Sequence, residues 1–204
     1  GEWQPNGRVW IVCDDFVLHS PGTIDVTGMG FTGGPFGEAG RGPGASKYDT
    51  HSSGPGYGGA GGDAGRFLFL PGGRSYGTVD GPVWPGSGSG SGNSVGGVAG
   101  GGAVQVEASG AVVISGVIAA DGMPAPGAYT SGGSGGGIYI SCQTISGAGG
   151  IIRADARDVN YCNGGPGGGR VVVHYNTTAQ AALPIPDILF SAYGGRYVGT
   201  PANA

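Results

Sequence analysis

The stretch GGSGGGIYIS, residues 132–141, joins a run of glycines directly to an alternating apolar run. Similar junctions occur in GVAGGGAVQV at 97–106, in GGPGGGRVVV at 164–173 and, more loosely, in GGDAGRFLFL at 61–70. Alternation with period two, as in Ile138 and Ile140, predicts strands that bury one face. Glycine in front of a strand lets the backbone approach a neighbouring segment closely. The junction therefore predicts tightly stacked β-units.

These junctions divide the chain into units that start about 32 to 36 residues apart, at Phe67, Ala103, Ile138 and Arg170. Each unit contains a strand, a turn, a second strand that ends near an aspartate, and a glycine-rich loop. One unit cannot bury its own apolar face, so the units must share a core. The predicted fold class is all-β, with a β-solenoid-like or β-sandwich repeat core.

The glycine-rich loops allow two interpretations. Gly34, Gly37 and Gly40 recur at every third residue, which suits polyproline II strands packed side by side with glycine on the crowded face. The alternative is a flexible linker. Interspersed Tyr, Phe and Pro favour the packed form.

We expect a single domain over residues 1–204. Its predicted parts are an N-terminal strand or arm (1–18), a first unit with a long glycine-rich loop (19–66), the repeats (67–175) and a C-terminal cap (176–204).

Composition excludes several classes of function. The 204 residues include 51 Gly and 14 Pro, but the net charge is only −4 and the apolar residues are clustered, which argues against disorder. The few basic residues form no stripe that could neutralise a nucleic-acid backbone. The apolar runs are too short to cross a membrane. The first residues, GEWQ, fit a mature secreted chain after signal removal.

The cysteines fit the same extracellular location. Cys142 and Cys162 are 20 residues apart, and a disulfide between them would close one loop. The alternative is three buried thiols, and Cys13 has no obvious partner.

Four aspartates follow predicted second strands: Asp25, Asp80, Asp121 and Asp155. Stacked in register, they would form a column of carboxylates that could bind Ca²⁺ or serve as an acid–base pair on a polysaccharide. The alternative, which we favour, is that each caps a turn through its own backbone. His19, His51 and His174 form no catalytic motif with these residues, so we expect no enzyme activity, no metal site and no cofactor.

The sequon Asn176-Thr177-Thr178 follows the strand VVVHY, in a turn that should be exposed. Asn176 is therefore the predicted glycosylation site.

The alternation of GGxGGG loops with VxVxxSGxVxIxGxIxADG strands resembles uncharacterised secreted glycine-rich β-repeat proteins. These are of the extracellular-fibril and β-solenoid surface-protein type. The resemblance covers roughly residues 60–175 and rests on pattern. It implies a secreted β scaffold and transfers no catalytic residue.

Three functions follow as hypotheses. The first is a non-catalytic extracellular structural protein, the protomer of a self-assembling filament or surface layer whose main partner is itself. The second is an adhesin or glycan-binding module that uses aromatic residues of the glycine-rich loops, namely Tyr48, Tyr57, Tyr76, Tyr129 and Trp84. The third, disfavoured by the missing catalytic cluster, is a polysaccharide-active β-helix enzyme.

The N-terminal segment is the predicted assembly element. Trp3 precedes an apolar run, Val9, Trp10, Ile11 and Val12, that is apolar on both faces of a strand. Insertion of this strand into a neighbouring subunit would bury both faces. The alternative is that residues 9–18 form the first strand of the chain's own core.

Overall fold

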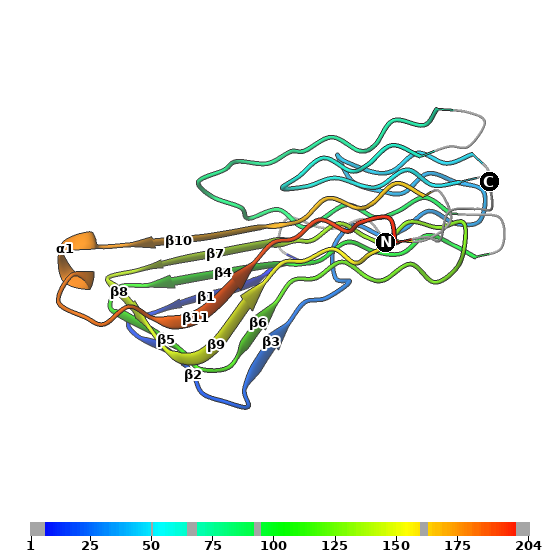
Figure 1. Cartoon of the computed structure of the whole chain (residues 1–204). Coiled ribbons are helices and arrows are strands. Elements are labelled where there is room, and N and C mark those ends of the chain that lie inside the picture. Colours follow the sequence, from blue (N-terminus) through cyan, green and yellow to red (C-terminus); the bar gives the residue numbers. More distant parts are fainter. Residues whose placement is uncertain (1–6, 50, 65–68, 92–94, 160–162, 199–204) are drawn as a thin grey trace.

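The computed structural model describes residues 7–49, 51–64, 69–91, 95–159 and 163–198. These residues form four coils of a parallel β-solenoid (Figure 1). Coil 1 contains β1 (Val9–Cys13), β2 (Phe16–Leu18) and β3 (Thr23–Asp25), and coil 2 contains β4 (Ala103–Ala108), β5 (Ala111–Ile114) and β6 (Val117–Ala119). Coil 3 contains β7 (Gly137–Cys142), β8 (Thr144–Ser146) and β9 (Ala148–Arg153), and coil 4 contains β10 (Arg170–Tyr175), α1 (Thr177–Gln180) and β11 (Asp187–Ser191).

Equivalent strands of successive coils pair in parallel and build three sheets. Sheet A has the order β1-β4-β7-β10, sheet B the order β2-β5-β8, and sheet C the order β11-β9-β6-β3. The register is regular: Val9 pairs with Val104, Val104 with Ile138, and Ile138 with Val171. The predicted all-β repeat fold is confirmed, and of the two architectures the solenoid is the one that forms.

The apolar core lies between sheets A and C and is closed at one end by sheet B. Val104, Ile138, Ile118 and Ile152 are completely buried there. These side chains occupy alternate positions because successive residues of a strand point to opposite faces. Burying each contributes roughly 1.5–3 kcal/mol, so the core residues that the alternation predicts do hold the coils together.

Beyond the strands, the two layers continue as extended glycine-rich segments without strands, which fill the other half of the molecule (Figure 1). The layers come into direct hydrogen-bonding contact where the strands end. Gly102 N donates to Val26 O, Gly136 N to Ala120 O, and Gly169 N to Ala154 O, each at 2.8 Å. The same contact thus recurs at each of the three steps from one coil to the next.

This contact explains the glycines in front of each strand. A Cβ at Gly101 would lie 1.9 Å from Ala120 O, and a Cβ at Gly135 would lie 2.0 Å from Ala154 O. No side chain fits at such distances. The return segment of a coil, which leads into its first strand, must therefore be glycine where it crosses the outgoing segment, which follows the last strand. The close approach predicted from the junction is confirmed.

The long excursion between β3 and β4 supplies a second, polar core. Its segment 85–91, with sequence PGSGSGS, is buried along its whole length. Ser87 N donates to Ser134 Oγ at 2.8 Å, and Ser87 Oγ accepts from Gly44 N at 3.0 Å. Ser89 Oγ accepts from Val98 N at 2.9 Å. Backbone and hydroxyl groups therefore satisfy one another in an interior that holds few apolar side chains.

Two details of the predicted organisation are corrected. The unit expected to start at Phe67, which lies outside the described residues, is not a coil: residues 69–91 and 95–102 contain no named strand and belong to the glycine-rich half. The every-third-residue spacing also holds only in part. Gly34 and Gly40 are crowded against neighbouring backbone, but Gly37 has open space around it and a φ of 78°, so its glycine serves a turn.

Candidate functional site

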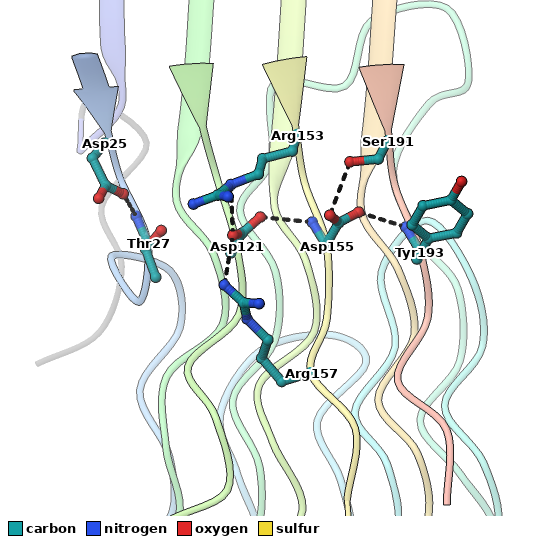
Figure 2. Close-up of polar contacts among 8 residues, drawn as sticks. All are labelled: Asp25, Thr27, Asp121, Arg153, Asp155, Arg157, Ser191 and Tyr193. Carbon is teal, nitrogen blue, oxygen red and sulfur yellow. Dashed lines mark hydrogen bonds and ion pairs between the residues drawn. The ribbon is translucent and has the colours of Figure 1, made fainter. Parts of the chain in front are cut away.

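Acidic and basic side chains gather where the strands of sheet C end (Figure 2). Asp121 Oδ1 accepts a hydrogen bond from Asp155 N at 2.9 Å. Asp155 in turn accepts from Ser191 Oγ and from Tyr193 N, both at 2.8 Å. Each carboxylate therefore binds the backbone of the following coil, and the two aspartates fasten coils 2, 3 and 4 together.

The second oxygen of Asp121 meets two guanidinium groups. Arg153 Nε lies 3.0 Å and Arg157 Nη2 lies 3.3 Å from Asp121 Oδ2 (Figure 2). The Asp121 side chain is almost completely buried, and this burial raises its pKa above the ordinary value; the hydrogen bond from Asp155 N and the charge of Arg153 oppose the rise. The arginines supply the positive charge that a buried carboxylate requires.

The column of four aspartates, which the sequence left open but did not favour, does not form. Asp121 and Asp155 occupy equivalent positions, but Asp25 is two residues out of step, because the register pairs Asp25 with Ala119. Asp25 Oδ1 instead accepts from Thr27 N at 2.8 Å, and hydrogen bonding to Thr27 lowers its pKa. This is the turn cap favoured from the sequence.

Asp80 lies far from this cluster, with its carbonyl oxygen 2.9 Å from His174 Nε2. Within the described ranges no three His, Cys, Asp or Glu side chains are grouped as a metal site would require.

The two arginines of the cluster are not among the site residues predicted from the sequence. The signal is present in the stretch RADAR, residues 153–157, in which Arg153, Asp155 and Arg157 alternate with alanine. Period-two spacing places all three on one side of an extended chain. The partner of the arginines is Asp121, from the preceding coil, and only the register between coils identifies it.

The coil 1 end of the stack leaves core-facing side chains partly uncovered. Val9 and Ile11 of β1 face the core but are only half-buried, whereas the equivalent Val104 and Val106 of coil 2 are completely buried. Phe16, Leu18 and Ile24 of the same coil are also only partly buried. The difference arises because, among the described residues, coil 1 has a neighbouring coil on one side only.

In the part of the chain that the structure describes, the coil 4 end has no further strand in two of its three sheets. Sheets A and C end on β10 and β11. Val171, Val173 and Ile188 pack on the core and remain partly exposed. Phe190, in register with the completely buried Ile152, is 43% exposed. An apolar edge is therefore presented at this end too.

Sheet B is closed at the coil 4 end by α1. Gln180 Oε1 accepts from Ile145 N at 2.8 Å, and Gln180 Nε2 donates to Ile145 O at 3.0 Å. One side chain thus takes the place of the next strand beside β8. Asn176 begins the helix by accepting hydrogen bonds from the backbone N–H groups of Thr178 and Ala179.

The predicted assembly strand is part of the chain's own sheet. Residues Val9–Cys13 form β1 and pair with β4, as in the alternative that residues 9–18 begin the chain's own core. Trp10 and Val12 point outward and are 56% and 69% exposed, so the single chain buries only one face of the strand. Trp3 lies outside the described residues.

The predicted disulfide finds no support. Cys142 is a buried free thiol at the α1 end of β7, and burial raises its pKa to about 11. Cys162 lies outside the described residues. Its described neighbours in the sequence, Val159 and Asn163, contact Tyr197 and Ala128 in the glycine-rich half. Cys13 is also a free thiol.

The remaining predicted site residues differ in accessibility. Asn176 is exposed, as expected, and its glycosylation stays a prediction; its Nδ2 donates to Gln143 Oε1 at 3.2 Å. Among the aromatic residues proposed to bind glycans, Tyr57 is completely buried, whereas Trp84 and Tyr129 are 41% and 37% exposed. Tyr76 and Tyr48 are half-buried. The five therefore do not form one exposed set.

Comparison of the chain with protein-family models, with curated proteins and with solved structures finds no match. The described residues form no helix of the length and apolar character that a membrane crossing needs.

Proposed function

We propose that this protein is a non-catalytic structural protomer that assembles with copies of itself into an extracellular filament or surface layer. The observation that carries the proposal is the state of the two stack ends. Each end has strand edges without a neighbouring strand in the described chain, together with core-facing apolar side chains that remain partly exposed. Such edges promote pairing with another chain unless they are covered.

The acidic cluster supports a structural role. Asp121 and Asp155 direct their oxygens at backbone N–H groups, a hydroxyl group and guanidinium groups of the same chain. These contacts stabilise the stack. An acid–base pair for polysaccharide cleavage would instead need carboxyl groups that face a substrate.

The glycan-binding alternative has weaker support. Tyr57 belongs to the interior, where its ring lies 4.9 Å from that of Tyr76. Trp84 and Tyr129 remain as candidate stacking surfaces for a sugar.

The experiment is to purify the protein and follow its association with concentration, by light scattering and negative-stain electron microscopy. We expect filaments from the unaltered chain. A chain that stays monomeric at high concentration contradicts the proposal.

A matched pair of variants tests whether the stack end makes the contact. Phe190→Lys places a charge at the open end, and we expect it to abolish assembly; Leu189→Lys places the same charge on the outer face of sheet C and should leave assembly intact. Both residues are exposed in the single chain, at 43% and 62%, so neither change should prevent folding. If Phe190→Lys assembles as well as Leu189→Lys and the unaltered chain, the coil 4 end is not used.

A further inference from the structure

We propose, on the basis of the proposed function, that coil 1 of a second copy adds to coil 4 as the next coil of the solenoid. Sheets A and C then continue without interruption: β10 pairs with β1 of the added copy, and β11 pairs with its β3. The occupant of the open end is thus a second copy of this chain, in parallel orientation and in the register that the chain uses internally.

The internal repeat fixes that register. The column Val9, Val104, Ile138 and Val171 runs through all four coils of sheet A, one residue per strand. In sheet C the corresponding columns are Ile24, Ile118, Ile152 and Phe190, and Thr23, Val117, Ile151 and Leu189. Adding one coil in the same register brings Val9 of the added copy beside Val171, and Ile24 beside Phe190.

The chemistry of the two ends is complementary in this register. Val171 and Val173 meet Val9 and Ile11, so half-buried aliphatic side chains become buried on both sides. Burial of such apolar surface is the main favourable contribution to association. The strand edges gain backbone hydrogen bonds in the same step.

Sheet B makes the two ends of the stack different and so gives the contact a direction. Gln180 already bonds the backbone of Ile145, so β2 of the added copy meets α1 and the connection after it instead of a strand. Leu183 and Ile185 in that connection are 42% and 95% exposed, and they provide apolar contacts for β2. The two ends differ, so the contact is head-to-tail and does not close on itself.

Cysteine cross-linking tests the register directly. Thr23 and Leu189 share one outward-facing column but lie on the first and last strands of sheet C. Within one chain, three strand spacings separate their Cα atoms by about 14 Å, which is too far for a disulfide. In the proposed stack, Thr23 of the added copy lies about 4.8 Å from Leu189, within disulfide range.

We expect the double variant Thr23→Cys/Leu189→Cys to give, on mild oxidation, a ladder of covalent multimers on a non-reducing gel, which reductant abolishes. The control is Val17→Cys/Leu189→Cys, with the same number of added thiols but with one of them in sheet B. It should give no ladder beyond that of the unaltered chain and of the two single variants, which account for Cys13, Cys142 and Cys162.

The outcomes separate this inference from the proposed function. Filaments without a ladder specific to Thr23→Cys/Leu189→Cys would overturn the coil-on-coil register and leave the structural role standing. Absence of assembly in the unaltered protein would reject both.

Discussion

Asp121 shows how a single residue links coils in this fold. Its carboxylate is buried; one oxygen accepts a hydrogen bond from Asp155 N, and the other accepts one from Arg157 Nη2 and forms an ion pair with Arg153. Such a group holds the coils in register, but its charge is costly to bury. The rise in the pKa of Asp121 with burial expresses that cost.

The contribution of the acceptor can be separated from that of the charge. Asp121→Ala leaves the N–H of Asp155 without its acceptor, and we expect a loss of about 1–3 kcal/mol in the free energy of unfolding. Asp121→Asn keeps an oxygen for that N–H and removes the charge, so it should cost less. Thermal denaturation of the three proteins at neutral pH checks the order, and equal losses would contradict it.

The same comparison has a pH dependence. Because the pKa of Asp121 is raised in the folded state, its protonation stabilises the fold; this stabilisation is fully present below the unfolded value of 3.8 and is lost as the pH rises through the folded pKa. Unaltered protein should therefore gain stability relative to Asp121→Asn as the pH falls into the acid range.

At the scale of elements, the distance between crossing backbones determines where the glycine-rich segments need glycine. Where the return segment of a coil crosses the outgoing segment, the backbones hydrogen-bond directly, and this is possible only without a Cβ on the facing residue. The sequence therefore predicts where close crossings occur. It does not predict which segments cross, because the segments that meet are far apart in the chain.

We expect Gly135→Ala to be strongly destabilising. Its Cβ would lie 2.0 Å from Ala154 O, a backbone atom held by the coil, so the crossing must open at a cost of about 1–3 kcal/mol or more. Gly59→Ala is the matched control, because its Cβ would have no neighbour nearer than 3.7 Å. Chemical denaturation of the two variants measures the difference, and similar losses would show that the crossing tolerates a methyl group.

At the scale of the whole molecule, the excursion between β3 and β4 packs back onto the solenoid through Tyr57, and Tyr76 packs beside Tyr57 within the excursion. The ring of Tyr57 lies 5.8 Å from the guanidinium carbon of Arg170, and its centroid lies 4.9 Å from that of the Tyr76 ring, which is tilted by 55°. Tyr76 Oη donates to Pro85 O at 2.5 Å and accepts from Ser87 Oγ at 3.0 Å. Coil 4 and the glycine-rich half are thereby joined.

We expect alkali to unfold the protein through these tyrosines. Burial raises the pKa of both above the ordinary value of 10.0, so the stabilisation they contribute is fully present below that pH and is lost as the pH rises through their folded pKa. Phenolate absorbance and circular dichroism followed with pH should show late ionisation coupled to unfolding. Tyr76→Phe should remove part of the phenolate absorbance that appears at high pH, and it should lower the free energy of unfolding by about 0.5–1.5 kcal/mol. Tyr193→Phe, at an exposed residue, should change neither quantity.

The sequence by itself determined the strand type, the inward faces and the need for glycine at the crossings. These follow from local causes: β-branched residues at alternate positions form half-buried strands, and GGG leaves room for a neighbouring backbone. Ile138, Ile140 and Val104 are buried as the alternation predicts.

Only the tertiary structure decided which segments of the chain contact one another. It made residues 9–25 the first coil, placed Asp25 out of step with Asp121, and buried the serines of segment 85–91 in a polar interior. The physical reason is that coil register and crossings are set by pairing between segments far apart in the sequence. A local pattern specifies the face of a strand but not the segment that the strand meets.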